Sequence, residues 1–226
     1  MQNMPDWSSA VKFVGKDAER RLATRNLVPG SQVYGEKLVN LQGAEYRLWS
    51  PYRSKLSAAI INDMKRGAIG DGWKVLYLGA ATGTTASHVS DIVGDGGAVF
   101  CVEFAPRPMK ELLRIIEDRP NMVPLMADAR RPETYAHLTP EVDFIYQDVA
   151  QPNQSEIFWE NARAFLAPGG GGVLMVKSRS VDVSLEPGEV FAGEVKNLSK
   201  WGLEVLETVN LSPFDKDHMA IVVRSR

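Results

Sequence analysis

The chain has 226 residues, 44% of them apolar and 24% charged, an ordinary composition for a globular protein with a substantial core. Its net charge of −2 and pI near 6.0 argue against a protein that holds nucleic acid unaided through counterion release. No apolar run approaches the roughly 20 residues of a membrane helix, and Met1 to Pro5 do not read as a secretory leader. We therefore expect a cytoplasmic protein, or a nuclear one if its source has a nucleus.

Residues 1–50 predict a small N-terminal antiparallel β subdomain. Short alternating sequences predict its strands, at 11–14, 21–24, 32–34 and 46–49. Turn-forming sequences separate them, at 15–17, 29–30 and 42–44. A meander of this size is marginal alone, so we expect it to pack on a larger domain at 51–226.

From Val75 onward, strand and helix patterns alternate, which predicts an α/β fold with a mostly parallel, Rossmann-like sheet. The Gly-rich run 168–172 should end a helix and turn into a strand. The loop 212–217 is too short for a parallel crossover, so the last strand should lie antiparallel. Strands are predicted at 74–79, 97–103, 121–126, 142–147, 171–178, 203–210 and 218–224. Helices are predicted at 52–66, 85–93, 107–118, 153–167 and 187–201, with a short turn after Asp128.

The stretch 73–87 predicts a nucleotide pocket. A short buried strand leads into small residues that include Gly79, Ala80 and Gly83, and Thr84-Thr85 then opens a helix. Amide groups of the loop and of the first helical turn lack backbone partners, so they face a ligand beyond the strand end. A dinucleotide site needs glycine where Ala81 stands, which makes a dehydrogenase the least favoured enzyme.

Acidic residues follow the next two strands. Glu103 lies 24 residues after Gly79, and a carboxylate there suits two ribose hydroxyls. Phe104 either packs on an adenine face or belongs to the core, and Asp128, beside Ala129, either accepts from an adenine amino group or caps the next helical turn. This series resembles the S-adenosylmethionine site of Rossmann-like methyltransferases, the alternative being a strand–helix turn without a ligand.

Polar residues at further strand ends are candidates for catalysis. Asp148 follows the strand 142–147, and Lys177 ends the strand after it. A lysine there needs a partner for its charge, so we expect Asp148 and Lys177 to pair, either as a structural salt bridge or as a coupled acid–base pair. His218 opens the last strand at the same rim, although a lone histidine is more often structural. Lys55, on the helix before the first parallel strand, would by spacing alone be a solvated surface residue.

These residues belong to motifs that together resemble the archaeal fibrillarin-like RNA 2′-O-methyltransferase family, over about residues 12–224. The expectation of an archaeal member rests on the missing Arg/Gly-rich N-terminal tail. The motifs are 26–30 (Asn-Leu-Val-Pro-Gly), 33–37 (Val-Tyr-Gly-Glu-Lys), 47–49 with 53–56, 77–85 (Tyr-Leu-Gly-Ala-Ala-Thr-Gly-Thr-Thr), 102–104 (Val-Glu-Phe), 146–151 (Tyr-Gln-Asp-Val-Ala-Gln) and 213–218 (Pro-Phe-Asp-Lys-Asp-His).

The resemblance implies which residues form the site. It implies the fold of a class I S-adenosylmethionine-dependent methyltransferase and a catalytic Lys-Asp-Lys-His set, and it makes Lys55 a strong candidate. The catalytic residues would be Lys55, Asp148, Lys177 and His218. The cofactor residues would be Gly79, Ala80, Thr84, Thr85, Glu103, Phe104, Asp128, Ala129, Asp148, Val149, Ala150 and Gln151.

The resemblance also implies a reaction and partners. Methyl groups would pass from S-adenosylmethionine to ribose 2′-hydroxyls of rRNA and tRNA, selected by a box C/D guide RNA. The particle would also contain a Nop-family scaffold protein and a kink-turn-binding ribosomal-protein-like subunit. A single cysteine, Cys101, excludes a Cys-rich zinc site, and no metal is expected. Two alternatives stay open, a stand-alone methyltransferase acting on a protein or small molecule and a non-catalytic cofactor-binding scaffold.

Overall fold

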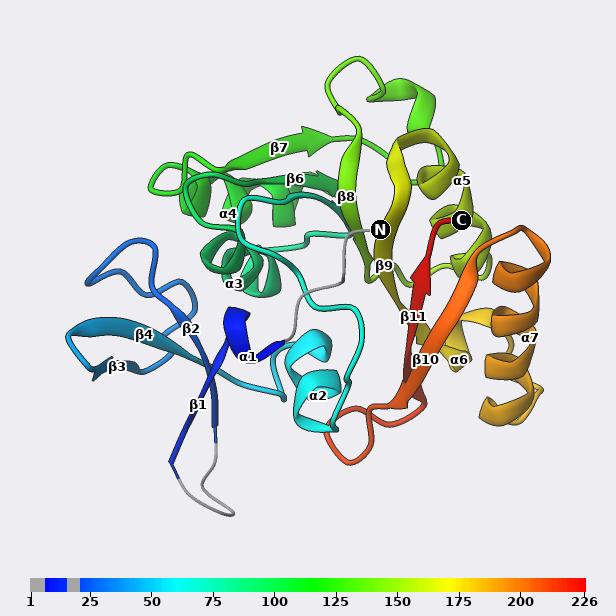
Figure 1. The fold of residues 1–226 in the computed structure, drawn as a ribbon. Helices are drawn as coiled ribbons and strands as arrows, with labels where there is room; N and C mark the ends of the chain where they lie inside the picture. The colour runs from blue at the N-terminus through cyan, green and yellow to red at the C-terminus, as the bar shows by residue number, and fades with distance from the viewer. Residues whose placement is uncertain (1–6, 16–20) are drawn as a thin grey trace.

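A seven-stranded sheet forms the centre of the larger part of the molecule (Figure 1). The computed structural model describes residues 7–15 and 21–226. The strand order is β10-β11-β9-β8-β5-β6-β7, and within it only β11 runs against its neighbours. The strands are β5 (Lys74–Leu78), β6 (Ala98–Glu103), β7 (Met122–Met126), β8 (Val142–Gln147), β9 (Leu166–Lys177), β10 (Glu204–Asn210) and β11 (His218–Arg224). The predicted mostly parallel sheet with an antiparallel last strand is therefore confirmed.

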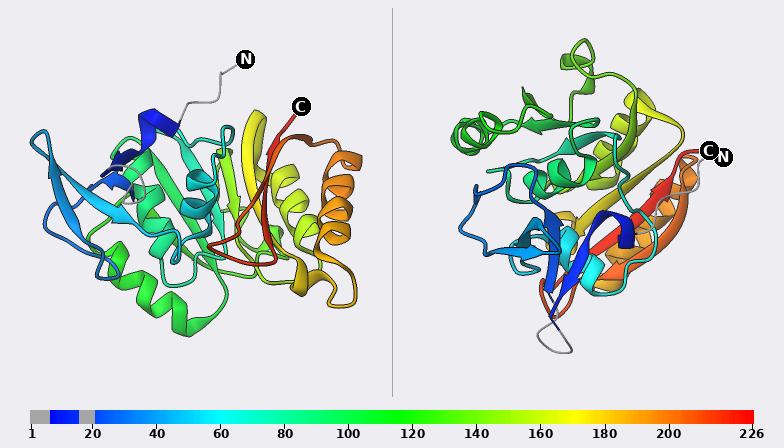
Figure 2. Two further views of the ribbon diagram at one scale, coloured as in Figure 1. Left: turned by 90° about the horizontal axis from the view of Figure 1, so that it is seen from below. Right: turned by 60° about the vertical axis from the view of Figure 1, so that its left-hand side comes forward.

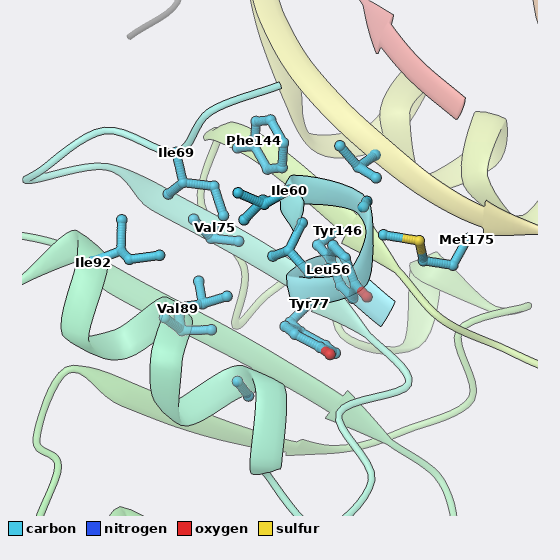
Figure 3. Packing of buried hydrophobic residues seen from close by; sticks show 14 of the residues in the cluster. Leu56, Ile60, Ile69, Val75, Tyr77, Val89, Ile92, Phe144, Tyr146 and Met175 are labelled. Atoms are coloured by element: carbon cyan, nitrogen blue, oxygen red, sulfur yellow. The ribbon is translucent and has the colours of Figure 1, made fainter. Parts of the chain in front are cut away.

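Helices cover both faces of this sheet. Along β5, Val75 and Tyr77 join one apolar cluster while Leu76 and Leu78 join the other, as the period of two in a strand requires. The first cluster packs under α2 (Lys55–Ile61), α3 (Thr84–Val93) and α4 (Pro106–Ile116), part of which Figure 3 shows. The second packs under α5 (Gln154–Phe165) and α7 (Pro187–Lys200). The remaining short elements are α6 (Ser178–Val181) and the 3₁₀ turn η2 (Pro132–Thr134).

The glycine run differs from its prediction. We expected 168–172 to separate a helix from a strand beginning at 171, but β9 begins at Leu166 and contains these glycines. A Cβ on Gly172 would lie 2.6 Å from the Phe158 ring of α5 and 2.9 Å from the Ile145 carbonyl oxygen of β8. The missing side chain at Gly172 therefore lets α5 pack closely on the strand, whereas Gly169, whose φ is +76°, lies where the pairing with β8 is irregular.

The N-terminal residues form a second, four-stranded antiparallel sheet, which projects from one flank of the larger sheet (Figure 2). Its order is β1-β2-β4-β3. After the short helix α1 (Trp7–Ala10), the strands are β1 (Lys12–Val14), β2 (Arg21–Arg25), β3 (Leu38–Leu41) and β4 (Ala44–Trp49). The turn expected at 15–17 lies partly outside the described residues, and the stretch 1–5 lies wholly outside them.

One predicted strand of this sheet is wrong. Residues 32–34 form a loop because the Glu36 carboxylate accepts hydrogen bonds from the backbone N–H groups of Val33 and Tyr34, at 2.8 to 3.1 Å. Beside β2, the strand that pairs with β4 is β3, and the predicted turn at 42–44 joins β3 to β4. Gln42 and Gly43 both have positive φ there, which suits the tight turns that connect twisted strands.

A buried network of charges joins the two sheets. Arg47 of β4 is fully buried and donates to Glu36 (2.5 Å), to Asp91 of α3 (2.9 Å) and to the Ser87 hydroxyl (2.9 Å). Arg119 also contacts Asp91, at 2.7 Å. Burial alone would raise the pKa of Glu36, but the Tyr34 and Val33 N–H groups and the Arg47 guanidinium lower it below its usual value. The boundary at residue 50 stays a prediction.

Helix α2 is shorter than the predicted 52–66. Ser54 caps it by accepting from the Ser57 N–H, and the helix ends at Ile61, with Asn62 as its C-cap before Asp63, whose φ is +71°. The Asn62 side chain then donates to the carbonyls of Asn210 (2.7 Å) and Ser212 (2.9 Å), which fixes α2 against the loop between β10 and β11. Among the described residues, no helix has the length and apolarity to cross a membrane.

Candidate active site

The loop between β5 and α3 lies against the segment that follows β8. Gly79 has a φ of +81°, and a Cβ there would lie 2.5 Å from the Asp148 carbonyl oxygen and 3.0 Å from Val149, so any side chain would separate the two segments. The Asp148 N–H donates to the Leu78 carbonyl at 3.0 Å, which holds the segments together from the other side. The predicted cofactor residues 79–80 and 148–151 therefore meet at the carboxyl ends of two neighbouring strands.

Glu103 joins this loop to the end of β6. One carboxylate oxygen accepts from the Ala81 N–H (2.9 Å) and the other from the Ala105 N–H (2.8 Å). Ala81 has a φ of +49°, an uncommon conformation for alanine, and its hydrogen bond to Glu103 helps to hold it there. Each carboxylate oxygen retains capacity to accept another hydrogen bond. Glu103 thus fixes the loop against the end of β6.

The next strand end brings Phe104, Asp128 and Ala129 near Glu103. The Glu103 carbonyl accepts from the Ala127 N–H at 3.2 Å, which places the segment after β7 beside it. Phe104 is 63% exposed, so the alternative of a core position is wrong and its ring is free to contact a flat ligand. Asp128 accepts from the Arg130 N–H (2.9 Å) and guanidinium (2.6 Å), and its pKa is lowered chiefly by that guanidinium. Asp128 therefore caps the turn at 128–130. The next helical turn, η2, has Arg131 as its N-cap.

Lys55 and Asp148 form an ion pair at the centre of the rim. The Lys55 ammonium donates to both Asp148 oxygens at 2.8 Å, although the two residues are 93 positions apart in the chain. Lys55 begins α2, and its N-cap Ser54 accepts from the Thr85 hydroxyl at 2.9 Å. The N-termini of α2 and α3 are therefore tied together, and this tie directs Lys55 toward the strand ends.

The predicted pairing of Asp148 with Lys177 is wrong. Among the described residues, no salt bridge or hydrogen bond engages the Lys177 ammonium, whereas Lys55 occupies both Asp148 oxygens. The register explains this: Gln147 lies opposite Leu174, so Lys177 lies two residues beyond the position opposite Asp148. Two residues of extended strand span about 6.6 Å, too far for a direct contact by register alone.

Lys177 and His218 are direct neighbours across β9 and β11. His218 is buried, and its Nδ1 lies 2.8 Å from both the Lys216 carbonyl oxygen and an Asp215 carboxylate oxygen. Both of these oxygens only accept, so Nδ1 carries a proton, and Nε2 is the nitrogen left for other contacts. The structure therefore brings the four predicted catalytic residues to one rim as two neighbouring pairs, Lys55 with Asp148 and Lys177 with His218.

Comparison with known proteins shows the family. The fibrillarin family model matches residues 7–226. The chain belongs to the fibrillarin family. It is 54% identical to the fibrillarin-like rRNA/tRNA 2′-O-methyltransferase of Methanopyrus kandleri, in an alignment that covers 92% of this chain and 89% of the relative. It is 50% identical to the fibrillarin-like rRNA/tRNA 2′-O-methyltransferase of Aeropyrum pernix, over 95% of this chain and 92% of the relative.

Solved structures of fibrillarins have the same architecture. Methanococcus jannaschii fibrillarin is 42% identical with a TM-score of 0.90, covering 95% of this chain and 97% of that one. Aeropyrum pernix fibrillarin, solved with natively bound S-adenosyl-L-methionine, is 49% identical with a TM-score of 0.87, covering 95% and 94%. A fibrillarin in complex with Nop5p is 39% identical with a TM-score of 0.86, covering 96% and 98%. An Aquifex aeolicus methyltransferase at 17% identity and a TM-score of 0.56 shares the fold alone.

Two tyrosines form a buried floor beside the rim of this fibrillarin family member. Tyr77 of β5 and Tyr146 of β8 lie with ring centroids 4.6 Å apart, beneath Leu56 of α2 (Figure 3). The pKa of Tyr77 is raised well above its usual value, first by burial and then by the negative charge of Asp148. The pKa of Tyr146 is also raised well above its usual value, by burial and then by the charges of Tyr77 and Asp148. Both hydroxyls therefore stay protonated at neutral pH, which excludes them as general bases.

Sequence reasoning missed two supporting residues. Ser54 connects α2 with α3, and its position just before an apolar helical stretch was a readable N-cap signal. Gln154 of α5 holds the end of β9, because its side chain accepts from the Lys177 N–H (3.0 Å) and donates to the Lys177 carbonyl (3.1 Å). No sequence signal marks Gln154. In the described part of the chain, no group of three or more His, Cys, Asp or Glu residues could hold a metal ion.

Proposed function

We infer that this chain is an S-adenosylmethionine-dependent methyltransferase that modifies ribose 2′-hydroxyls of rRNA and tRNA. The observation that carries this conclusion is the position of Asp148. Its carboxylate is paired with Lys55, and its backbone carbonyl lies against Gly79 of the nucleotide loop. In a fibrillarin family chain, Asp148 therefore connects the nucleotide loop, where the methyl donor would bind, with the charged residues that would hold the methyl acceptor.

The strand-end residues fit the cofactor. The first turn of α3, at Thr84 and Thr85, offers amide groups without intrahelical partners, and Glu103 offers carboxylate oxygens for ribose hydroxyls. The exposed Phe104 ring offers a surface for the adenine. Asp128, Ala129 and the segment 148–151 would complete the contacts. Bound S-adenosylmethionine supplies a methyl group that its sulfonium already activates.

The chain's own residues then have to place the ribose and take a proton. The Lys55–Asp148 pair is held from two helices and a strand end, so it provides a fixed charged contact for the acceptor nucleotide. The Lys177 ammonium has no ion-pair partner among the described residues, which leaves this nitrogen free to contact the 2′-hydroxyl and, when neutral, to accept its proton. His218, opposite Lys177, would direct its Nε2 side to the same nucleotide.

We propose that the chain works within a guided particle. Its net charge of −2 means that other components must supply much of the attraction for RNA. A box C/D guide RNA would select the nucleotide, a Nop-family scaffold protein would bind this chain, and a kink-turn-binding subunit would hold the guide. The complex of a related fibrillarin with Nop5p supports the scaffold contact.

The test is methyl transfer from labelled S-adenosylmethionine to a target RNA, with and without the other particle components. We expect transfer only in the complete particle, and Lys177→Ala should lower the rate about 10²–10⁴-fold while cofactor binding stays measurable by calorimetry. Lys200→Ala, on the exposed end of α7, is the matched control and should not change the rate. Transfer to RNA by Lys177→Ala at the wild-type rate would favour the non-catalytic scaffold. Transfer by the isolated chain to a protein or small molecule would favour the stand-alone enzyme.

A further inference from the structure

The Thr85 hydroxyl is already engaged, although Thr85 stands among the residues predicted to bind the cofactor. It donates to the Ser54 hydroxyl oxygen, just before α2, at 2.9 Å. The N-cap of α3, Gly83, makes no side-chain hydrogen bond, so the N–H groups of the first turn of α3 lack intrahelical partners. The backbone of Thr85 therefore stays available to a cofactor, while its side chain makes a contact with α2.

Ser54 receives two hydrogen bonds at the N-terminus of α2. Its hydroxyl oxygen accepts from the Ser57 N–H at 3.3 Å, which makes Ser54 the N-cap, and from the Thr85 hydroxyl. Ser54 is buried, so bulk water does not compete for either contact. Helix α2 has only seven residues, and a helix of this length is not stable in isolation. Its first turn therefore depends on the cap and on the contact with α3.

Lys55 is the first residue of α2, directly after this cap. Its ammonium donates to both Asp148 oxygens at 2.8 Å, and the two side chains are 25% and 27% exposed. Ordering a long lysine side chain costs conformational entropy, and a partly exposed ion pair offsets little of that cost by itself. The position of the ammonium therefore depends on where the first turn of α2 holds the Lys55 backbone.

Asp148 connects Lys55 to the nucleotide loop by a separate route. The Asp148 N–H donates to the Leu78 carbonyl at 3.0 Å, and a Cβ on Gly79 would lie 2.5 Å from the Asp148 carbonyl oxygen. Two routes therefore lead from the nucleotide loop to the Lys55 ammonium, one through the end of β8 and one through Thr85 and Ser54. The second route joins the start of α3 directly to the helix that carries a predicted catalytic residue.

We propose that Thr85 is a positioning residue for methyl transfer: its hydroxyl, through Ser54, fixes the first turn of α2 and thereby holds the Lys55 ammonium on Asp148. The inference rests on the proposed function and assigns the Thr85 side chain to the acceptor side of the site, while the Thr85 N–H remains on the cofactor side. When the sulfonium already activates the methyl group, alignment is the main task of the protein, and a displacement of about 1 Å can lower a rate about 10²-fold.

Single-turnover methyl transfer in the complete particle is the first test. Thr85→Val keeps the β-branched shape and removes the hydroxyl donor, so the rate at saturating S-adenosylmethionine should fall about 10- to 100-fold. The Kd for S-adenosylmethionine should stay at its wild-type value by calorimetry, and the melting temperature should fall by no more than about 2–4 °C. Thr85→Ser should restore the rate because it restores the hydroxyl. Thr208→Val, at an exposed position of β10, is the matched control and should not change the rate.

A double-mutant cycle tests whether Thr85 acts through Lys55. Lys55→Gln removes the charged contact with Asp148, and the rate of this variant is the reference. If Thr85 acts by holding Lys55, then adding Thr85→Val to Lys55→Gln should lower the rate by less than about a further twofold. Rate losses that multiply would show that the two residues act independently and would overturn the proposal.

Nuclear magnetic resonance gives a readout that does not require turnover. In the full-length chain with S-adenosylmethionine, the Lys55 ammonium should give a ¹H–¹⁵N signal protected from exchange with water, because both Asp148 oxygens accept from it. Lys55→Gln assigns this signal by its loss. Thr85→Val should broaden or abolish the signal, whereas Thr85→Ser and Thr208→Val should retain it. A signal that Thr85→Val leaves unchanged, or the absence of a protected signal in the wild-type chain, would overturn the proposal.

The outcomes separate this inference from the proposed function. A wild-type particle that transfers no methyl group to RNA refutes the proposed function. A particle with Thr85→Val that methylates RNA at the wild-type rate refutes the positioning role and leaves the methyltransferase intact. A weaker Kd for S-adenosylmethionine with an unchanged rate at saturation would make the Thr85 hydroxyl a cofactor contact. A rate loss that Thr85→Ser does not restore, accompanied by an equal loss of stability, would make it purely structural, and either result overturns the proposal.

Discussion

Replacement of Arg47 by methionine should destabilise the whole chain. Arg47 is fully buried and makes three polar contacts, to Glu36, Asp91 and Ser87. Methionine approximates the length of the arginine stem but leaves the Glu36 carboxylate without a cation among the described residues. Asp91 would keep its contacts with Arg119 (2.7 Å) and Thr24 (2.7 Å), so the damage concentrates on Glu36.

The magnitude follows from this burial. Removing one partner of a buried ion pair costs about 3–5 kcal/mol, because the other charge stays buried and uncompensated. For a chain of this size, each kcal/mol corresponds to about 2–4 °C, so the melting temperature should fall by roughly 6–20 °C. Far-UV circular dichroism during chemical and thermal unfolding gives both quantities.

A surface ion pair provides the matched control. Arg163 contacts Glu160 at 2.6 Å on α5, but its side chain is 66% exposed, so Arg163→Met should cost less than about 1 kcal/mol. Arg47→Lys keeps the charge and separates its loss from the loss of the guanidinium contacts. If Arg47→Met were no more destabilising than Arg163→Met, the network would not be the connection between the two sheets that the structure indicates.

Two further predictions concern the nucleotide loop and the buried histidine. Gly79→Ala should weaken S-adenosylmethionine binding by calorimetry, because its Cβ would lie 2.5 Å from the Asp148 carbonyl oxygen, and wild-type affinity would contradict that contact. Burial first, then the positive charges of Arg47 and Arg119, hold the pKa of His88 well below its usual value. The unfolded chain therefore binds a proton below about pH 6.5 that the folded chain does not, so stability should fall with decreasing pH by up to about 1.4 kcal/mol per unit from this residue. His88→Phe should remove that part of the slope in unfolding titrations, whereas parallel profiles for the two proteins would refute the assignment.

The parallel sheet could be predicted from the sequence because its signals are local. Apolar runs bounded by turn residues gave the bounds of β8 and β11 correctly, and the short loop before His218 gave the antiparallel direction of the last strand. The same patterns correctly place Gly79 just after β5 and Glu103 at the end of β6, while their contacts with a cofactor stay a prediction. These inferences need only neighbouring residues and one topological rule.

The pairing of the charged groups could not be predicted in the same way. The contact between Lys55 and Asp148 depends on how α2 sits over the strand ends, which no spacing in the chain encodes, so only the family resemblance favoured Lys55. The expected pair of Lys177 with Asp148 does not form because β9 extends past β8, so Lys177 lies two residues beyond the position opposite Asp148. The network of Arg47 and Asp91 gave no signal, since charged residues are ordinarily at the surface.

That network has a practical consequence for anyone who cuts or recombines this protein. A fragment that starts after residue 50 would lose Arg47 and Glu36 and would present Asp91 to solvent along an α3 surface built to be covered. Another N-terminal module grafted onto residues 51–226 would therefore have to cover this face of α3 and supply a polar partner for Asp91 in place of Arg47.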